Sequence, residues 1–122
     1  MDDYVKLYRE LESGIVRVKF IKKDGTVRDM LCSRDMTIID VLHPGVYRKL
    51  GSHASRCNKK TGAIAVIDLI LGECRAFSVN RIIENENYGE AETEEDIMKL
   101  YDKYVNREKV GEEESLTIDM LD

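Results

Sequence analysis

The sequence predicts an α+β fold, in which a small antiparallel β-barrel is flanked by an N-terminal and a C-terminal helix. Two segments, 15–32 and 63–79, each contain a pair of strand-like apolar runs joined by a turn signal, as β-hairpins do. Both ends of the chain instead repeat apolar residues every three or four positions, as amphipathic helices do. The chain has 122 residues, enough for one hydrophobic core, and no apolar run approaches the roughly 18 residues of a membrane span.

The N-terminal helix is expected at residues 2–12. Asp2 and Asp3 suit the positively polarised start of a helix, and Gly14 can terminate it. Its apolar face would consist of Tyr4, Leu7, Tyr8 and Leu11. The spacing of these residues therefore predicts a short amphipathic helix before the first strand.

The first hairpin is predicted around Asp24-Gly25, because both residues tolerate positive φ. The strand at 15–21 would place Val16, Val18 and Phe20 on its apolar face and Arg17 and Lys19 on its polar face. Residues 26–32 return as the second strand. A second hairpin is predicted from strands at 63–71 and 74–79, with a turn at Gly72-Glu73.

The segment between the hairpins has weaker periodicity. Residues 37–42 fit either a short strand or a helical turn, and His43-Pro44-Gly45 ends that element. Residues 47–62 are polar and basic, with glycines at 51 and 62, and are expected to be mostly loop.

After the second hairpin, residues 80–92 are expected to leave the barrel as a polar linker. The C-terminal helix then begins at Thr93 as N-cap and can close at Gly111. Its apolar face would consist of Ile97, Leu100, Tyr101, Tyr104 and Val105. The expected divisions are an N-terminal helix at 1–13, the barrel at 14–84, the linker and C-terminal helix at 85–111, and an acidic tail at 112–122, which is either disordered or a docking peptide.

Charge is divided unevenly along the chain. Residues 14–62 carry eleven basic and four acidic residues, whereas residues 84–122 carry four basic and fourteen acidic residues. A basic half joined to an acidic half is typical of proteins that bind a polyanion or carry an interaction tail.

Two runs in the barrel resemble a known family. Residues 20–28 read FIKKDGTVR, and residues 75–82 read RAFSVNRI, which is similar to the R-x-F-x-x-x-R-I ending of WYL-type domains. On these motifs, residues 15–84 resemble the WYL-like group of Sm-like small barrels, many of them phage-encoded. Arg75, Phe77 and Arg81 match the family pattern position by position. The Trp-Tyr-Leu triplet of the family is absent, since the sequence contains no Trp.

The resemblance implies a barrel associated with binding of nucleic acid or a nucleotide ligand, frequently in a regulatory role. The missing triplet weakens the small-ligand interpretation. Arg75 lies on the same strand face as Phe77 and is interpreted as a structural residue that pairs with Asp68 or with an acid of the C-terminal half. Arg81 is left with two interpretations, a nucleic-acid contact or a bond to backbone carbonyls.

We therefore expect a non-catalytic, regulatory nucleic-acid-binding protein, with RNA or single-stranded DNA as the partner. Such proteins combine a positive groove for phosphates with a ring on which a base stacks. The loop at 47–62 has basic residues and no acid, Tyr47 supplies a ring, and the first hairpin, including Lys22 and Lys23, extends the patch. The predicted nucleic-acid-binding residues are Arg17, Lys19, Tyr47, Arg48, Lys49, Arg56, Lys59, Lys60 and Arg81.

No catalytic residue, cofactor or metal is expected. The sequence lacks nucleophile-elbow and phosphate-binding glycine motifs, and His53 and Cys57 are the only close pair of zinc-type ligands. Three cysteines without framework spacing suggest reduced thiols. The acidic start argues against a signal peptide, so we expect a cytoplasmic protein, in the host cytoplasm for a phage product, without a membrane partner.

The acidic C-terminal half supports an alternative function. In that hypothesis the chain is a protein-interaction module that binds and modulates a host protein through this half. The tail can equally pair with a second copy, giving a homo-oligomer, or fold back over the basic loop of its own chain.

Overall fold

The computed structural model describes residues 3–52 and 57–121, with side chains described for 3–51 and 57–107. The elements are, in chain order, α1 (Asp3–Ser13), β1 (Gly14–Ile21), β2 (Val27–Ser33), α2 (Met36–Leu42), α3 (Arg48–Ser52), β3 (Ala63–Asp68), β4 (Glu73–Ser78), the 3-10 helix η2 (Val79–Arg81), β5 (Ile82–Glu90) and α4 (Glu94–Leu121).

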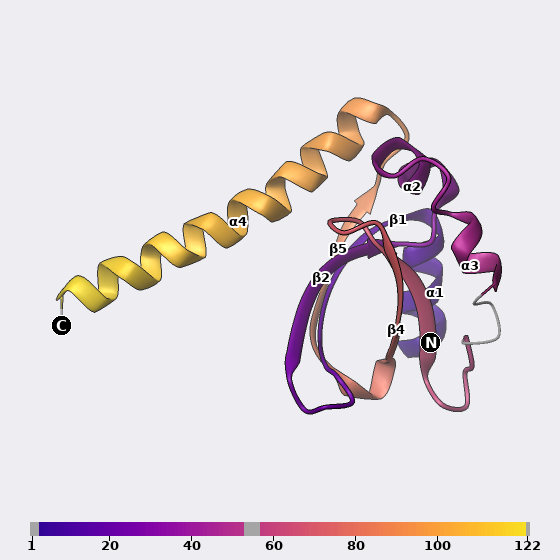
Figure 1. Ribbon diagram of the computed structural model, residues 1–122, viewed down its shortest axis with the longest axis horizontal. Coiled ribbons are helices and arrows are strands. Elements are labelled where there is room, and N and C mark those ends of the chain that lie inside the picture. The colour runs from indigo at the N-terminus through magenta and orange to yellow at the C-terminus, as the bar shows by residue number, and fades with distance from the viewer. Residues whose placement is uncertain (1–2, 53–56, 122) are drawn as a thin grey trace.

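The five strands form one antiparallel sheet in the order β4-β3-β2-β1-β5, which curls into an open barrel (Figure 1). Six residue pairs join β1 to β2, and six join β3 to β4. Only two pairs, Cys32 with Asp68 and Ser33 with Ile67, join β2 to β3. The two hairpins therefore diverge from a short junction, and the barrel is not closed between the edge strands β4 and β5. The predicted α+β barrel with a helix at each end is confirmed.

Apolar side chains pack on both faces of the sheet. On the inner face, Val16 and Val18 of β1 join Leu7 and Leu11 of α1 in one buried cluster. On the outer face, Ile15 belongs to a second cluster that is built from α2, α3, β3 and the first half of α4. The strands β1, β2 and β3 thus contribute alternate residues to two apolar layers, because successive side chains of a strand point to opposite faces.

The predicted polar linker at 80–92 is wrong, because residues 82–90 form β5 beside β1. Tyr88 is the one buried residue of β5, and the polar residues of the strand before it, at positions 84–87, are exposed. β5 lies at the edge of the sheet, and charged side chains on an edge strand hinder unwanted pairing with another strand. A rule based on apolar alternation does not detect such a strand.

Three further boundaries differ from or refine the sequence analysis. Residues 36–42 are the helix α2, capped by Asp35, whose carboxylate accepts a hydrogen bond from the N–H of Ile38 at 3.1 Å. Residues 48–52 form the short helix α3 inside the predicted loop, where Leu50 is buried. Thr93 caps α4 as predicted, with Oγ1 3.1 Å from the N–H of Asp96, but the helical backbone continues past residue 111 to Leu121.

Arg17 does not lie on an exposed polar face, contrary to the expectation from the alternation of residues 15–21. Its side chain is on the outer face of β1, which α4 covers, and the residue is only 4% exposed. The guanidinium donates to Asp29, with Nη2 2.6 Å from Oδ2, and to Glu84 at 2.8 Å. From α4, the Tyr104 hydroxyl donates to Asp29 at 3.1 Å, and Arg107 lies 3.4 Å from the same carboxylate. A buried charge needs such partners, and here they fasten α4 to the sheet.

This network shifts the pKa values of its members. Burial alone would raise the pKa of Asp29, but the hydrogen bond and charge of Arg17, with Tyr104 and Arg107, outweigh burial and hold it below its usual value. The hydrogen bond from Arg17 likewise lowers the pKa of Glu84. The guanidinium of Arg17 has a raised pKa, chiefly because Asp29 stabilises its charged form.

The approach of β1 to β5 requires glycine at position 14. A Cβ there would lie 2.4 Å from the carbonyl oxygen of Gly89, which is backbone and cannot rotate away. We expect Gly14→Ala to lower the free energy of unfolding by about 1–3 kcal/mol, measured by urea denaturation. Gly51→Ala in α3 is the matched control, because nothing lies within 4 Å of its added Cβ. Equal stability of the two variants would contradict this packing.

Removing the Arg17 guanidinium leaves Asp29 with a smaller set of partners in a partly desolvated site. Because Tyr104 and Arg107 remain beside that carboxylate, we expect Arg17→Met to cost about 2–3 kcal/mol, below the usual range for breaking a buried pair. Lys19→Met, on the same strand face but half-buried, is the control and should cost less. Urea denaturation measures both, and a Lys19 variant as unstable as the Arg17 variant would rule out a special role for Arg17.

The lowered pKa of Asp29 makes stability depend on pH. Since the folded pKa lies below the unfolded value of about 3.9, the contribution of this group is fully present above about pH 5 and is lost as the pH falls through the folded pKa. We expect the unfolding free energy of Asp29→Asn to decline less between pH 5 and pH 2 than that of the wild type. Asp40→Asn, an exposed change in α2, should keep the wild-type decline.

Candidate nucleic-acid interface

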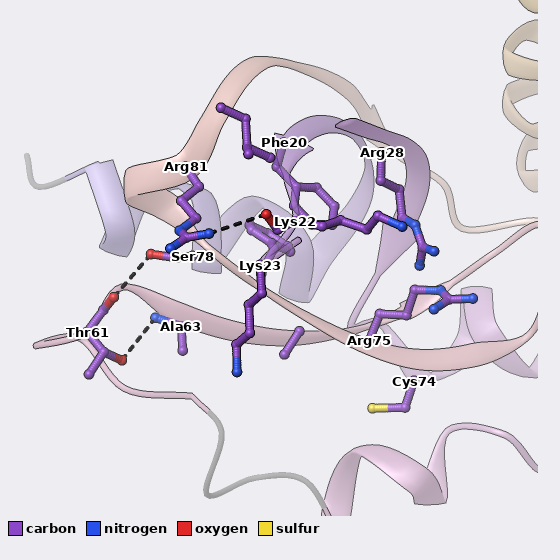
Figure 2. Close-up of a pocket in the computed structure, with 13 residues that line it drawn as sticks. Phe20, Lys22, Lys23, Arg28, Thr61, Ala63, Cys74, Arg75, Ser78 and Arg81 are labelled. Carbon is purple, nitrogen blue, oxygen red and sulfur yellow. Dashed lines mark hydrogen bonds between the residues drawn. The ribbon is translucent and has the colours of Figure 1, made fainter. Parts of the chain in front are cut away.

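A groove of about 870 Å³ lies between the β1–β2 hairpin and β4 (Figure 2). Its walls come from residues 20–23 and 28 of the first hairpin and residues 74–78 of β4, together with Thr61, Ala63 and Arg81. The groove exists because β2 and β3 pair over only two residue pairs, so the two hairpins stand apart beyond that junction.

Strand register explains which side chains enter the groove. Phe20 and Arg28 are opposite each other in the β1–β2 register and therefore share a face. Phe77 and Arg75 share a face of β4 because they are two residues apart. The two phenylalanine rings contact each other at 5.4 Å between centroids, and each residue is 4% exposed. The rings thus form a buried floor, and they are not free to stack on a base.

The walls are strongly basic. No Asp or Glu is found among the described residues that line the groove. Five of these residues are cations, namely Lys22, Lys23, Arg28, Arg75 and Arg81. In Figure 2 the guanidinium groups of Arg28 and Arg75 lie at one end, and Arg81 lies at the other. Positive charge therefore extends along the groove rather than gathering at one point.

The five cations differ in how firmly they are held. Arg75 is 3.4 Å from the carboxylate of Asp68 and 2.8 Å from that of Glu73, so the predicted pairing with Asp68 is confirmed. Arg81 donates to the carbonyl oxygen of Lys22 at 3.3 Å, as in one of its two interpretations from the sequence. Within the described parts of the chain, no ion pair or side-chain hydrogen bond engages the charged groups of Lys23 and Arg28. These two remain available to an anionic ligand.

The predicted binding residues are only partly brought together. Arg81 lines the groove, and Lys59 and Lys60 are exposed on the turn that leads into Thr61 at its rim. Tyr47, which is 37% exposed, and Arg48 and Lys49 lie at the start of α3 and do not line it. Arg56 is outside the described residues. Arg17 is buried and paired with acidic residues. Lys19 lies opposite Asp29 on β2 and opposite Glu84 on β5.

From the sequence alone, Arg28 has no predicted role, Arg75 has a predicted structural role, and Lys22 and Lys23 only extend another basic patch. Periodicity places Arg28 on the face of Phe20 and Arg75 on the face of Phe77, and this signal was available. What periodicity does not show is that the two hairpins face each other across an open seam. That arrangement follows from the short β2–β3 junction.

The thiols and histidines do not form a metal site in the part of the chain that the structure describes. Cys32 is fully buried, and burial raises the pKa of its thiol well above the usual range, so the thiol stays protonated. His43 Nε2 lies 2.7 Å from the carbonyl oxygen of Leu69, a contact within the protein.

None of the helices in the described ranges is long and apolar enough to cross a membrane.

Comparison with known proteins agrees with this architecture. Residues 4–83 match the family model described as WYL_2, Sm-like SH3 beta-barrel fold. The chain is also 32% identical over 77 residues to an uncharacterized 11.5 kDa protein in the Gp31-cd intergenic region of Enterobacteria phage T4; the match covers 63% of this chain and 71% of that protein. No solved structure shows significant similarity to the chain. The family match spans more than half of the chain, and the chain belongs to the WYL_2 family of Sm-like SH3 β-barrels.

Proposed function

We propose that the protein binds single-stranded nucleic acid, RNA or single-stranded DNA, without catalysing a reaction. The observation that carries this proposal is the groove with five cationic side chains and no carboxylate among its described lining residues. Single strands are held mainly by cations that neutralise phosphates and release condensed counterions. Lys23 and Arg28 supply that charge without first breaking an internal ion pair.

The shape of the groove favours a single strand over a duplex. Three of its cations, Lys22, Lys23 and Arg28, stand on the first hairpin. Arg75 faces them from β4, and Arg81 follows in η2. A flexible strand can enter such a recess and expose successive phosphates to both walls. A duplex, which keeps its bases stacked inside a stiff cylinder, would contact only the rim.

The basic surface beside the groove extends the proposed interface. Lys59 and Lys60 adjoin Thr61 at the rim, so a strand that leaves the groove there continues over their ammonium groups. Away from the groove, we assign base stacking to Tyr47, which is 37% exposed, with Arg48, Lys49 and Arg56 as further phosphate contacts. The relative from Enterobacteria phage T4 supports a phage-related setting, and we propose that the protein acts there as a regulator in the host cytoplasm.

The proposal is tested with the double variant Lys23→Glu, Arg28→Glu. We expect at least a tenfold loss of affinity for a labelled single-stranded RNA or DNA in fluorescence anisotropy. The slope of log affinity against log salt should become shallower by roughly 1.4, since each lost phosphate contact on a single strand removes about 0.7.

The matched control is Arg9→Glu, Lys99→Glu, which changes the net charge equally at exposed positions on α1 and α4. Its affinity should remain within about twofold of the wild type, allowing for weak long-range effects. Equal losses of affinity in both double variants would show that binding depends on net charge and not on the groove. Absence of binding by the wild type at low salt would refute the function itself.

A further inference from the structure

The end of the chain carries the charge opposite to that of the groove. Residues 108–122 contain six acidic residues and one basic residue, together with Leu116, Ile118, Met120 and Leu121. The groove offers five cations along with apolar lining residues such as Ile21 and Ala76. The two surfaces are therefore complementary in charge, and both mix ionic with apolar groups.

The helix α4 carries this acidic end away from its own barrel. Tyr104 and Arg107 fasten α4 to Asp29 on the outer face of the sheet, whereas the groove is lined from the inner face by Phe20 and Phe77. Beyond that anchor the backbone remains helical to Leu121 and projects past the sheet (Figure 1). At 1.5 Å per residue, residues 108–121 extend it by about 21 Å.

A continuous helix cannot turn back around the sheet to reach the groove of the same molecule. A second copy of the chain has no such restriction, because its groove can approach the projecting end from outside. We propose that the acidic end of α4 from a second copy occupies the cationic groove, in contact with Lys23 and Arg28.

Two consequences follow from this docking. The protein self-associates as concentration rises, and salt weakens the association because opposite charges are screened. The acidic end also competes with nucleic acid for one groove, so binding of the strand and self-association oppose each other. The second consequence rests on the proposed function, whereas the first does not.

Sedimentation velocity of the full chain over a wide concentration range tests the association. In the variant Glu112→Gln, Glu113→Gln, Glu114→Gln, we expect the dissociation constant for self-association to rise at least fivefold. The groove variant Lys23→Glu, Arg28→Glu should show a similar rise. The control Glu86→Gln, Glu90→Gln, Glu92→Gln makes the same charge change at exposed positions on and just after β5 and should associate as the wild type does.

Mixing the two impaired variants gives the decisive measurement. One retains an intact groove and the other an intact acidic end, so their mixture should form a heterodimer that neither forms alone. Circular dichroism of each variant confirms that the fold is retained. A monomeric wild type at all concentrations, a triple-Gln variant that associates like the wild type, or a mixture without heterodimer would each overturn the proposal.

Anisotropy titrations of the same proteins separate this inference from the proposed function. We expect the triple-Gln variant at Glu112, Glu113 and Glu114 to bind single-stranded nucleic acid at least threefold more tightly than the wild type at concentrations where the wild type self-associates. If no protein binds nucleic acid while the mixture still forms the heterodimer, the proposed function fails and the docking stands. If the variant binds nucleic acid with wild-type affinity at those concentrations, the competition is refuted.

Discussion

The carboxylate of Asp29 is the acceptor on which three elements converge. It receives hydrogen bonds from Arg17 of β1 and Tyr104 of α4, it is within 3.4 Å of Arg107, and it belongs itself to β2. Burying Arg17 without this acid would carry a large desolvation cost. With it, the outer face of the sheet accommodates a charge and gains a fixed contact for a helix that is otherwise joined to the barrel through a modest apolar face.

On β2, the residue before Asp29 lies on the opposite face of the sheet. Arg28 points to the groove and Asp29 to α4, because neighbouring residues of a strand alternate between faces. The contact that fixes the C-terminal helix therefore also fixes the strand that presents a main cation of the groove. The basic and acidic blocks of the sequence meet at this strand, as they also do where Arg17 pairs with Glu84 and where β5 pairs with β1.

The elements with strong local signals were predictable. The Asp24-Gly25 turn, the amphipathic start of the chain and the Thr93 cap depend on neighbouring residues alone, and each appears in the structure. The strand β5 was not predictable in this way, since its only buried side chain is Tyr88 and its stability comes from pairing with β1. Arg17 was misjudged for the related reason that alternation shows which face a residue occupies but not what covers that face.

The groove, like β5, depends on how distant segments are arranged and not on a local sequence signal. Its two facing walls, the first hairpin and β4, are more than forty residues apart in the sequence. Only the angle between the hairpins makes Arg28 and Arg75 members of one surface. Composition indicated a basic region at 47–62, where charge is dense in the sequence. The structure gathers charge between the hairpins, where no local run of basic residues marks it.

The short junction between β2 and β3 has a mechanical consequence. Two residue pairs and one hydrogen bond from Leu69 to Leu31 connect the hairpins through the sheet, while Phe20 and Phe77 connect them through side chains. At the other end of the opening, Arg81 donates to the carbonyl oxygen of Lys22, and Ile82, the next residue, pairs with Phe20 of β1. The opening is therefore connected at both ends, and between them its width depends on how the rings of Phe20 and Phe77 pack.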